Sequence, residues 1–156
     1  MNISYIGTIK TPFKSLEGMP VQSRLAIGIK GKIILDKVFA DGLKDIEGFS
    51  HIIVLFHFHR AKKFSLEVVP FLDSKPHGVF ATRAPRRPNP IGFSIVRLIK
   101  RNENILYVED VDMLDDTPLI DIKPFIPYFD NRKTTRVGWL NNKQLKKAGN
   151  ADNRFS

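Results

Sequence analysis

The stretch HIIVLFHFH, from His51 to His59, is the most strand-like part of this 156-residue chain. Each of its even positions carries an apolar side chain, and its odd positions mix aliphatic residues with three histidines. Because successive side chains of a strand point to opposite faces, this alternation predicts a β-strand.

Shorter apolar runs lie on both sides of this stretch. We expect further strands at residues 3–10, 32–39, 92–100, 105–111 and 119–125, separated by turn signals such as Asp41-Gly42, the polar RNEN at 101–104 and Thr117-Pro118. Helical periodicity is scarce, with a brief helix expected near 41–47 and another at 139–148. Many short strands between Gly and Pro turns favour a mainly β fold, a single-domain closed or nearly closed β-barrel with few short helices. We place the barrel at residues 1–137 and a basic C-terminal helix or tail at residues 138–156.

The composition excludes several classes of protein. The chain is 42% hydrophobic and 26% charged, as in ordinary globular domains, and it has no cysteine for disulfides or thiolate chemistry. No apolar run approaches the roughly 20 residues of a membrane span, and the N-terminal stretch lacks the pattern of a signal peptide. Glycine-rich Rossmann and P-loop motifs are absent, as is G-x-S-x-G. We therefore expect a cytoplasmic protein without a membrane partner and without a Rossmann nucleotide site.

The charge balance favours a polyanionic partner. Lys and Arg number 25 and Asp and Glu number 16, which gives a net charge of +9 and a pI near 9.9. Residues 130–156 alone hold seven cations against two carboxylates. Nucleic acid is the commonest such partner, and the alternative is a basic protein that has no polyanionic partner.

Two groups of residues have the chemistry of metal ligands. His57 and His59 would share one face of a strand, but the nearest third candidate ligand, His77, is far along the chain, so we expect no metal. The acidic stretch VEDVDMLDDT, at residues 108–117, leaves three possibilities open: a divalent-ion site, solvated carboxylates in a turn, or an acid that binds amino or hydroxyl groups of a ligand.

The stretch FATRAPRRPNPIGFS, from Phe80 to Ser94, has the character of a ligand site. Its prolines fix φ and hold the preceding Arg87 and Asn89 extended, so the loop loses little entropy on binding. Three arginines offer paired donors to carboxylate or phosphate, and Gly92 either lets the backbone approach a ligand or takes a positive φ. The alternative is a cationic surface loop.

Four motifs, in this order along the chain, resemble the TsaA-like domain of the TrmO family of tRNA methyltransferases. They are IGTIKTPF at 6–13, GFSHIIVLFHFH at 48–59, HGVFATRAPRRPNPIGFS at 77–94 and LDDTPLIDIKPFIPYFD at 114–130. The resemblance implies a non-Rossmann β-barrel that works as a homodimer with S-adenosyl-L-methionine as cofactor. It also implies a tRNA substrate, methylated on the exocyclic N6 of threonylcarbamoyladenosine at position 37.

The resemblance also implies roles for individual residues. Those placed at the cofactor are Gln22, Ser23, Arg24, Phe58, His59, Arg83, Phe93, Val111 and Asp112. Our own candidates, chosen by side-chain chemistry, are His59, Asp112 and Asp115 for a catalytic base, and Arg86, Arg87, Asn89 and Lys123 for substrate or RNA contacts.

The chain departs from the family pattern at two places. Asp116 stands where the family has the glycine of Asp-Gly-Thr-Pro, so we expect a positive φ at a non-glycine residue. MPVQSR at 19–24 has one arginine fewer than the family segment. Two alternatives stay open: the same cofactor with another RNA or a small-molecule acceptor, or a non-catalytic RNA-binding barrel.

Overall fold

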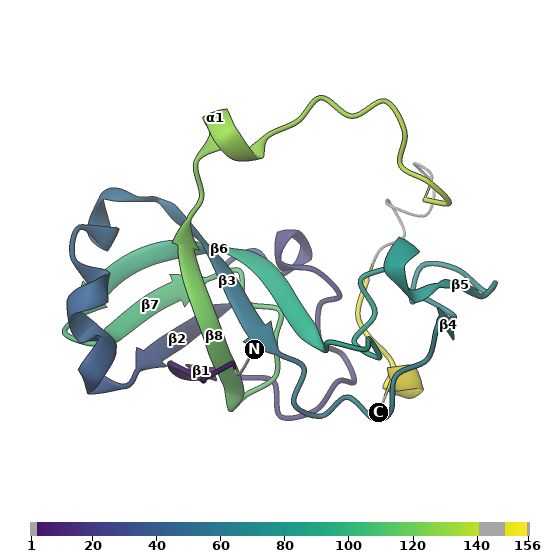
Figure 1. The fold of residues 1–156 in the computed structure, drawn as a ribbon, viewed down its shortest axis with the longest axis horizontal. Helices are drawn as coiled ribbons and strands as arrows, with labels where there is room; N and C mark the ends of the chain where they lie inside the picture. Colours follow the sequence, from purple (N-terminus) through teal and green to yellow (C-terminus); the bar gives the residue numbers. More distant parts are fainter. Residues whose placement is uncertain (1–2, 141–148, 156) are drawn as a thin grey trace.

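A closed antiparallel barrel forms the body of the computed structural model, which describes residues 3–140 and 149–155 (Figure 1). Its strands follow one another around the barrel in the order β1, β2, β7, β6, β3 and β8. Their bounds are β1 Gly7–Lys10, β2 Lys30–Leu35, β3 His51–His57, β6 Ile91–Asn102, β7 Ile105–Glu109 and β8 Thr117–Pro124. The predicted mainly β, barrel-like fold is confirmed.

Smaller elements surround the barrel. Strands β4 (Glu67–Val68) and β5 (His77–Gly78) form a separate two-stranded sheet. The only α-helical turn among the described residues is α1, Pro127–Asp130, which follows β8. The 3₁₀ segments are η1 Ser23–Leu25, η2 Lys37–Leu43, η3 Ile46–Gly48, η4 Val79–Ala81 and η5 Asn153–Phe155. In the part of the chain that the structure describes, no helix is long and apolar enough to cross a membrane.

Strand β3 pairs with β6 along one edge and with β8 along the other. Its even positions Ile52, Val54 and Phe56 are at most 4% exposed and face the core, as the alternation predicts. The core fills the barrel with branched aliphatic side chains, the most buried of which are Ile9, Ile33, Ile52, Val54, Val96, Leu106, Val108 and Leu119. A second, smaller apolar cluster lies under the β4–β5 sheet and contains Val68, Val79, Ala84, Phe71 and Phe155.

Three expectations about local structure need correction. The strand expected at 32–39 ends at Leu35, because the chain turns at Asp36 into η2 and leaves Val38 81% exposed. The brief helix expected at 41–47 is two separate 3₁₀ segments instead of one α-helix. The helix expected at 139–148 lies almost wholly outside the described residues.

Gly92 is required by close packing within the barrel. It is not among the glycines with positive φ, and a Cβ atom there would lie 2.2 Å from Cε2 of the Phe56 ring. The two residues are partners in the β3–β6 pairing, so the buried ring lies against the backbone of the neighbouring strand.

We predict that Gly92→Ala lowers the free energy of unfolding by about 1–3 kcal/mol, because an added Cβ would overlap the buried Phe56 ring and force it to shift. Denaturant unfolding measures this change. Gly42→Ala is the matched control, since an added Cβ there meets no heavy atom within 4 Å. Equal stability of the two variants would contradict the packing constraint.

Candidate functional site

A pocket of about 290 Å³ opens at the end of the barrel where β3 stops and β6 begins. Its walls come mainly from four places in the sequence. These are the segment before η1, the residues that end and follow β3, the arginine-rich loop at 80–90 with the start of β6, and the segment between β7 and β8. The pocket is at the small end of the range for ligand sites, and apolar side chains make up most of its lining.

Six of the nine residues expected at the cofactor line this pocket. They are Gln22, Phe58, His59, Arg83, Phe93 and Asp112. Of the other three, Val111 is fully buried, Arg24 is exposed, and Ser23 begins η1 next to Gln22. The fold therefore brings together residues that are up to 90 positions apart in the sequence.

Asp112 is the acidic group of the pocket. Its Oδ1 accepts a hydrogen bond of 2.6 Å from the Ser94 hydroxyl, whose residue is 3% exposed. Burial raises the pKa of Asp112 to about 6, although Ser94, the Ser23 amide and the Arg83 charge act in the opposite direction. The carboxyl group therefore changes charge just below neutral pH, which is uncommon outside functional sites.

Arg83 is an exposed cation that lines the pocket, and its charge acts on Asp112. Its guanidinium donates a 2.6 Å hydrogen bond to Gln22 Oε1 and lies 5.8 Å from the centre of the Phe93 ring. Three residues expected at the cofactor thus contact one another. The contact with Phe93 leaves the remaining guanidinium nitrogens available to a ligand carboxylate or phosphate.

Phe58 and His59 follow β3 and enter the pocket from its end. The Phe58 ring packs edge-on against the Phe56 ring, with 5.3 Å between ring centres. The Phe58 amide donates to Pro90 O at 2.8 Å, which ties this segment to the arginine-rich loop. Burial, together with the charge of Arg60, lowers the pKa of His59. His59 is therefore neutral at neutral pH and can accept a proton.

The second histidine of this stretch has a local partner. His57 also lines the pocket, and its Nδ1 lies 2.8 Å from the Tyr5 hydroxyl. Among residues 3–140 and 149–155, no group of three or more His, Asp or Glu side chains could hold a metal ion.

The arginine-rich loop is held by its own side chains. Arg87 lines the pocket, but its Nη1 donates to Val79 O and Thr82 O, both at 2.9 Å. Arg86 lines a different cavity, of about 370 Å³, beside the β4–β5 sheet. Asn89 is exposed outside the pocket, and Lys123 on β8 pairs with Asp121 at 2.7 Å. The four residues expected to contact substrate are therefore not gathered in one place.

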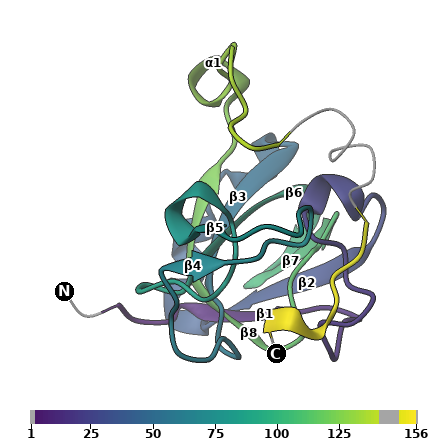
Figure 2. The ribbon, with the colours of Figure 1, turned by 90° about the vertical axis from the view of Figure 1, so that its right-hand side faces the viewer.

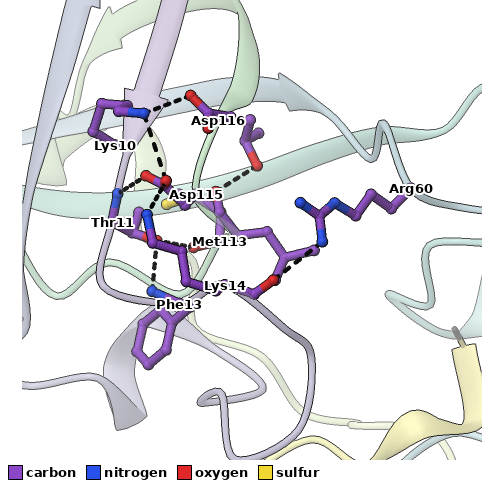
Figure 3. A network of polar contacts seen from close by, with 10 residues as sticks. Lys10, Thr11, Phe13, Lys14, Arg60, Met113, Asp115 and Asp116 are labelled. Carbon is purple, nitrogen blue, oxygen red and sulfur yellow. Dashed lines mark hydrogen bonds and ion pairs between the residues drawn. The ribbon is translucent and has the colours of Figure 1, made fainter.

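Asp115 lies outside the pocket, in the network of Figure 3. It is 4% exposed, pairs with the Lys14 ammonium, accepts a 2.9 Å hydrogen bond from the Thr11 amide, and lies 3.5 Å from Lys10 Nζ. Burial alone would raise the pKa of Asp115, but these partners outweigh it and lower the pKa to about 2. This carboxylate joins the β1 end to the β7–β8 connection and does not contact the pocket.

Asp116, next to it, has a φ of +60° and pairs with Lys10 at 2.6 Å. The expected positive φ at this non-glycine position is confirmed. Asp tolerates the left-handed region better than most residues, which explains how it can stand at this turn.

Several pocket residues have no signal in the sequence. Leu16, Phe71, Ala151 and Phe155 line the pocket without belonging to any pattern that predicts a site. They are ordinary apolar residues, and only the fold brings them together. The last two lie in a tail that the sequence describes only as basic.

Comparison with known proteins gives three concordant matches. The family model described as the tRNA-methyltransferase O N-terminal domain matches residues 8–131. A probable S-adenosyl-L-methionine-binding protein of Pyrococcus abyssi is 54% identical over 96% of this chain and 82% of its own length. The tRNA (adenine(37)-N6)-methyltransferase of Escherichia coli is 35% identical over 81% of this chain and 58% of its own length.

A solved structure has the same fold. The crystal structure of TrmO from Pseudomonas aeruginosa matches 90% of this chain with a TM-score of 0.76 and 36% identity. The chain spans 63% of the length of that protein.

We predict that Asp115→Asn destabilises the fold by about 1–2 kcal/mol above pH 4, because the buried acceptor loses its charge. The folded-state pKa of Asp115 is below its unfolded value near 3.9, so the charge contributes stability above that value. The difference between wild type and variant should therefore vanish as the pH falls towards 2. Unfolding curves at several pH values test this, with exposed Asp116→Asn as the control.

Proposed function

Because the chain belongs to the family of the tRNA-methyltransferase O N-terminal domain, we propose that it is an S-adenosyl-L-methionine-dependent tRNA methyltransferase whose target is N6 of threonylcarbamoyladenosine at position 37. The observation that carries this proposal is the pocket, which gathers Gln22, Phe58, Arg83 and Asp112. The names of the P. abyssi and E. coli relatives support the cofactor and the tRNA substrate, respectively.

The pocket residues fit the chemistry of the cofactor. Phe58 and Phe93 offer aromatic faces to an adenine ring, and the Asp112 carboxylate suits ribose hydroxyls or an ammonium group. Arg83 suits the carboxylate of the amino-acid part. No glycine-rich loop is needed, since in this site side chains rather than a helix N-terminus provide the polar contacts.

S-adenosyl-L-methionine supplies, when bound, an electrophilic methyl group on a sulfonium sulfur. The acceptor nitrogen is part of a ureido linkage and is a weak nucleophile. As the new N–C bond forms, the bond between the methyl carbon and the sulfonium sulfur breaks, a neutral thioether leaves, and the proton on the nitrogen must pass to a base. His59 and Asp112 are the proton acceptors that we propose, because both line the pocket and both have shifted pKa values. We do not propose Asp115 as the base, because it lies in a salt-bridge network and not among the residues that line the pocket.

Positive charge around the site supports a tRNA substrate. The net charge of +9 gives nonspecific attraction to phosphates, and Arg86, Arg87, Asn89 and Lys123 remain our proposed contacts with RNA. Arg87 can contribute only the nitrogens that the Val79 and Thr82 carbonyls leave unused. We further propose that two copies work as a homodimer in the cytoplasm.

The experiment that tests the function follows transfer of a labelled methyl group from S-adenosyl-L-methionine to total tRNA. The two substrates are tRNA with and without the threonylcarbamoyl group. Incorporation only into the modified tRNA supports the whole proposal. Cofactor binding without labelling of either tRNA would favour another acceptor, and RNA binding without cofactor binding would favour a non-catalytic RNA-binding barrel.

We predict that affinity for S-adenosyl-L-methionine falls as the pH drops below about 6. Protonation neutralises the Asp112 carboxylate, and binding that requires the charged form weakens by about tenfold per pH unit below its pKa. Calorimetric titrations between pH 5 and 8 measure this effect. Asp112→Asn should bind weakly at every pH and lose the pH dependence, whereas an unchanged pH profile in this variant would contradict the role of Asp112.

We also predict that Arg83→Ala raises the dissociation constant for the cofactor roughly tenfold or more, through loss of a charge-assisted hydrogen bond. Arg97→Ala is the charge-matched control, because Arg97 is exposed on β6 and pairs with Glu109 outside the pocket. Equal affinities of the two variants would show that Arg83 does not contact the cofactor.

A further inference from the structure

At the start of the C-terminal segment 149–155, residues 149–151 pair antiparallel with residues 18–21, which lead to Gln22. The Ala151 amide donates to Met19 O at 2.6 Å and the Gly18 amide donates to Ala151 O at 3.1 Å, around a β-bridge between Pro20 and Asn150. Figure 2 shows these residues in yellow, passing along the molecule beside the purple N-terminal part of the chain. The tail is therefore paired with a segment that forms part of the pocket.

The far end of this segment is anchored in the second apolar cluster. Phe155 is 5% exposed and packs edge-on against Phe71 with 5.0 Å between ring centres, next to Val68 and Val79. Arg154 donates a 2.7 Å hydrogen bond to Pro70 O and lies over the Phe71 ring at 5.2 Å. The tail thus joins the segment before η1 to the region beneath the β4–β5 sheet.

Both ends of the tail contribute to the wall of the pocket. Ala151 and Phe155 line it together with Leu16, Met19 and Phe71, and Ala151 is only 6% exposed. The family match ends at residue 131, so these residues lie beyond the part of the chain that the family assigns.

We infer that residues 149–155 form a strap that completes the binding site for S-adenosyl-L-methionine, with Phe155 as its anchor. The strap supplies the apolar wall through Ala151 and Phe155, and it holds the 16–21 segment so that Gln22 stays beside Arg83. This inference rests on the proposed function, since it concerns the same pocket and the same cofactor.

The strap should affect affinity through the fraction of molecules in which it is docked. If the site binds the cofactor only with the strap in place, the apparent dissociation constant is the intrinsic constant divided by that fraction. Phe155→Ala removes the buried ring that holds the strap. A fall in the docked fraction to about one tenth would therefore raise the dissociation constant about tenfold.

The test measures S-adenosyl-L-methionine binding by calorimetry to the full-length wild type, Phe155→Ala and Phe155→Leu. We expect a rise of about tenfold for Ala and a smaller rise for Leu, which keeps most of the apolar volume. Phe129→Ala is the matched control, because Phe129 is a 60% exposed aromatic residue on α1 outside the pocket, and it should bind like the wild type.

Hydrogen exchange at the Gly18 and Ala151 amides measures independently whether the strap is docked, because both amides donate hydrogen bonds between the strap and residues 18–19. Cofactor binding should slow their exchange in the wild type, and Phe155→Ala should speed it. Arg154→Ala removes the hydrogen bond to Pro70 O and leaves the Phe155 ring in place. It should therefore raise the dissociation constant in the same direction if Phe155→Ala proves too unstable to assay.

The failures of the two proposals are distinguishable. Wild-type affinity in Phe155→Ala and Arg154→Ala, with faster exchange at Gly18 and Ala151, would show that the strap is structural only and would overturn the inference alone. A wild-type protein that binds no S-adenosyl-L-methionine would overturn the proposed function and the inference together.

Discussion

The contact between the Phe56 ring and the backbone of Gly92 is the constraint on which the pocket depends. It lies near the end of the β3–β6 pairing, where the two strands are still hydrogen-bonded and their chains are about to separate. Beyond it, Phe58 packs on Phe56 and bonds to the arginine-rich loop, and one residue after Gly92 the strand carries Phe93 to Arg83. A side chain at position 92 would overlap the Phe56 ring. Close contact between the ring and the Gly92 backbone therefore lets Phe56 pack where these two walls of the pocket begin.

Two acidic residues only three positions apart show how the fold assigns opposite roles to the same chemistry. Asp112 faces the pocket, and burial raises its pKa to about 6, although the hydrogen bond from Ser94 and the charge of Arg83 act in the opposite direction. Asp115 has Lys14, Lys10 and the Thr11 amide around it, and these partners lower its pKa to about 2. The two pKa values therefore differ widely. Asp112 gains or loses its proton near neutral pH, whereas Asp115 stays ionised and contributes to stability. Their shared acidic stretch in the sequence leaves this distinction open.

The sequence predicts the barrel well because strand alternation is a local property, as β3 shows from His51 to His57. The strand prediction fails after Leu35. Val38 is a side chain typical of strands, but the chain has already turned into the 3₁₀ segment η2, and Val38 is exposed there. At the site, most of the cofactor residues expected from the family motifs line one pocket. Long motifs shared with a family allow this prediction, because residues of one motif keep the same place in the fold. Lys123, which we expected at the substrate, lies on β8 and is not among the residues that line the pocket. Apolar wall residues such as Phe71 follow from tertiary packing alone, which no local pattern encodes.

The pocket is built where regular structure ends, and this explains why distant parts of the chain must hold one another in place. A closed barrel leaves no free strand edge, so the loops at its mouth gain order from contacts among themselves and with the strand ends. Arg87 supplies such contacts by holding the carbonyls of Val79 and Thr82, and the C-terminal residues supply them by pairing with Gly18 and Met19. Both arrangements fix backbone before any ligand arrives, which lowers the ordering cost of binding. A small barrel can therefore present a preformed cofactor site without the helices that support a Rossmann fold.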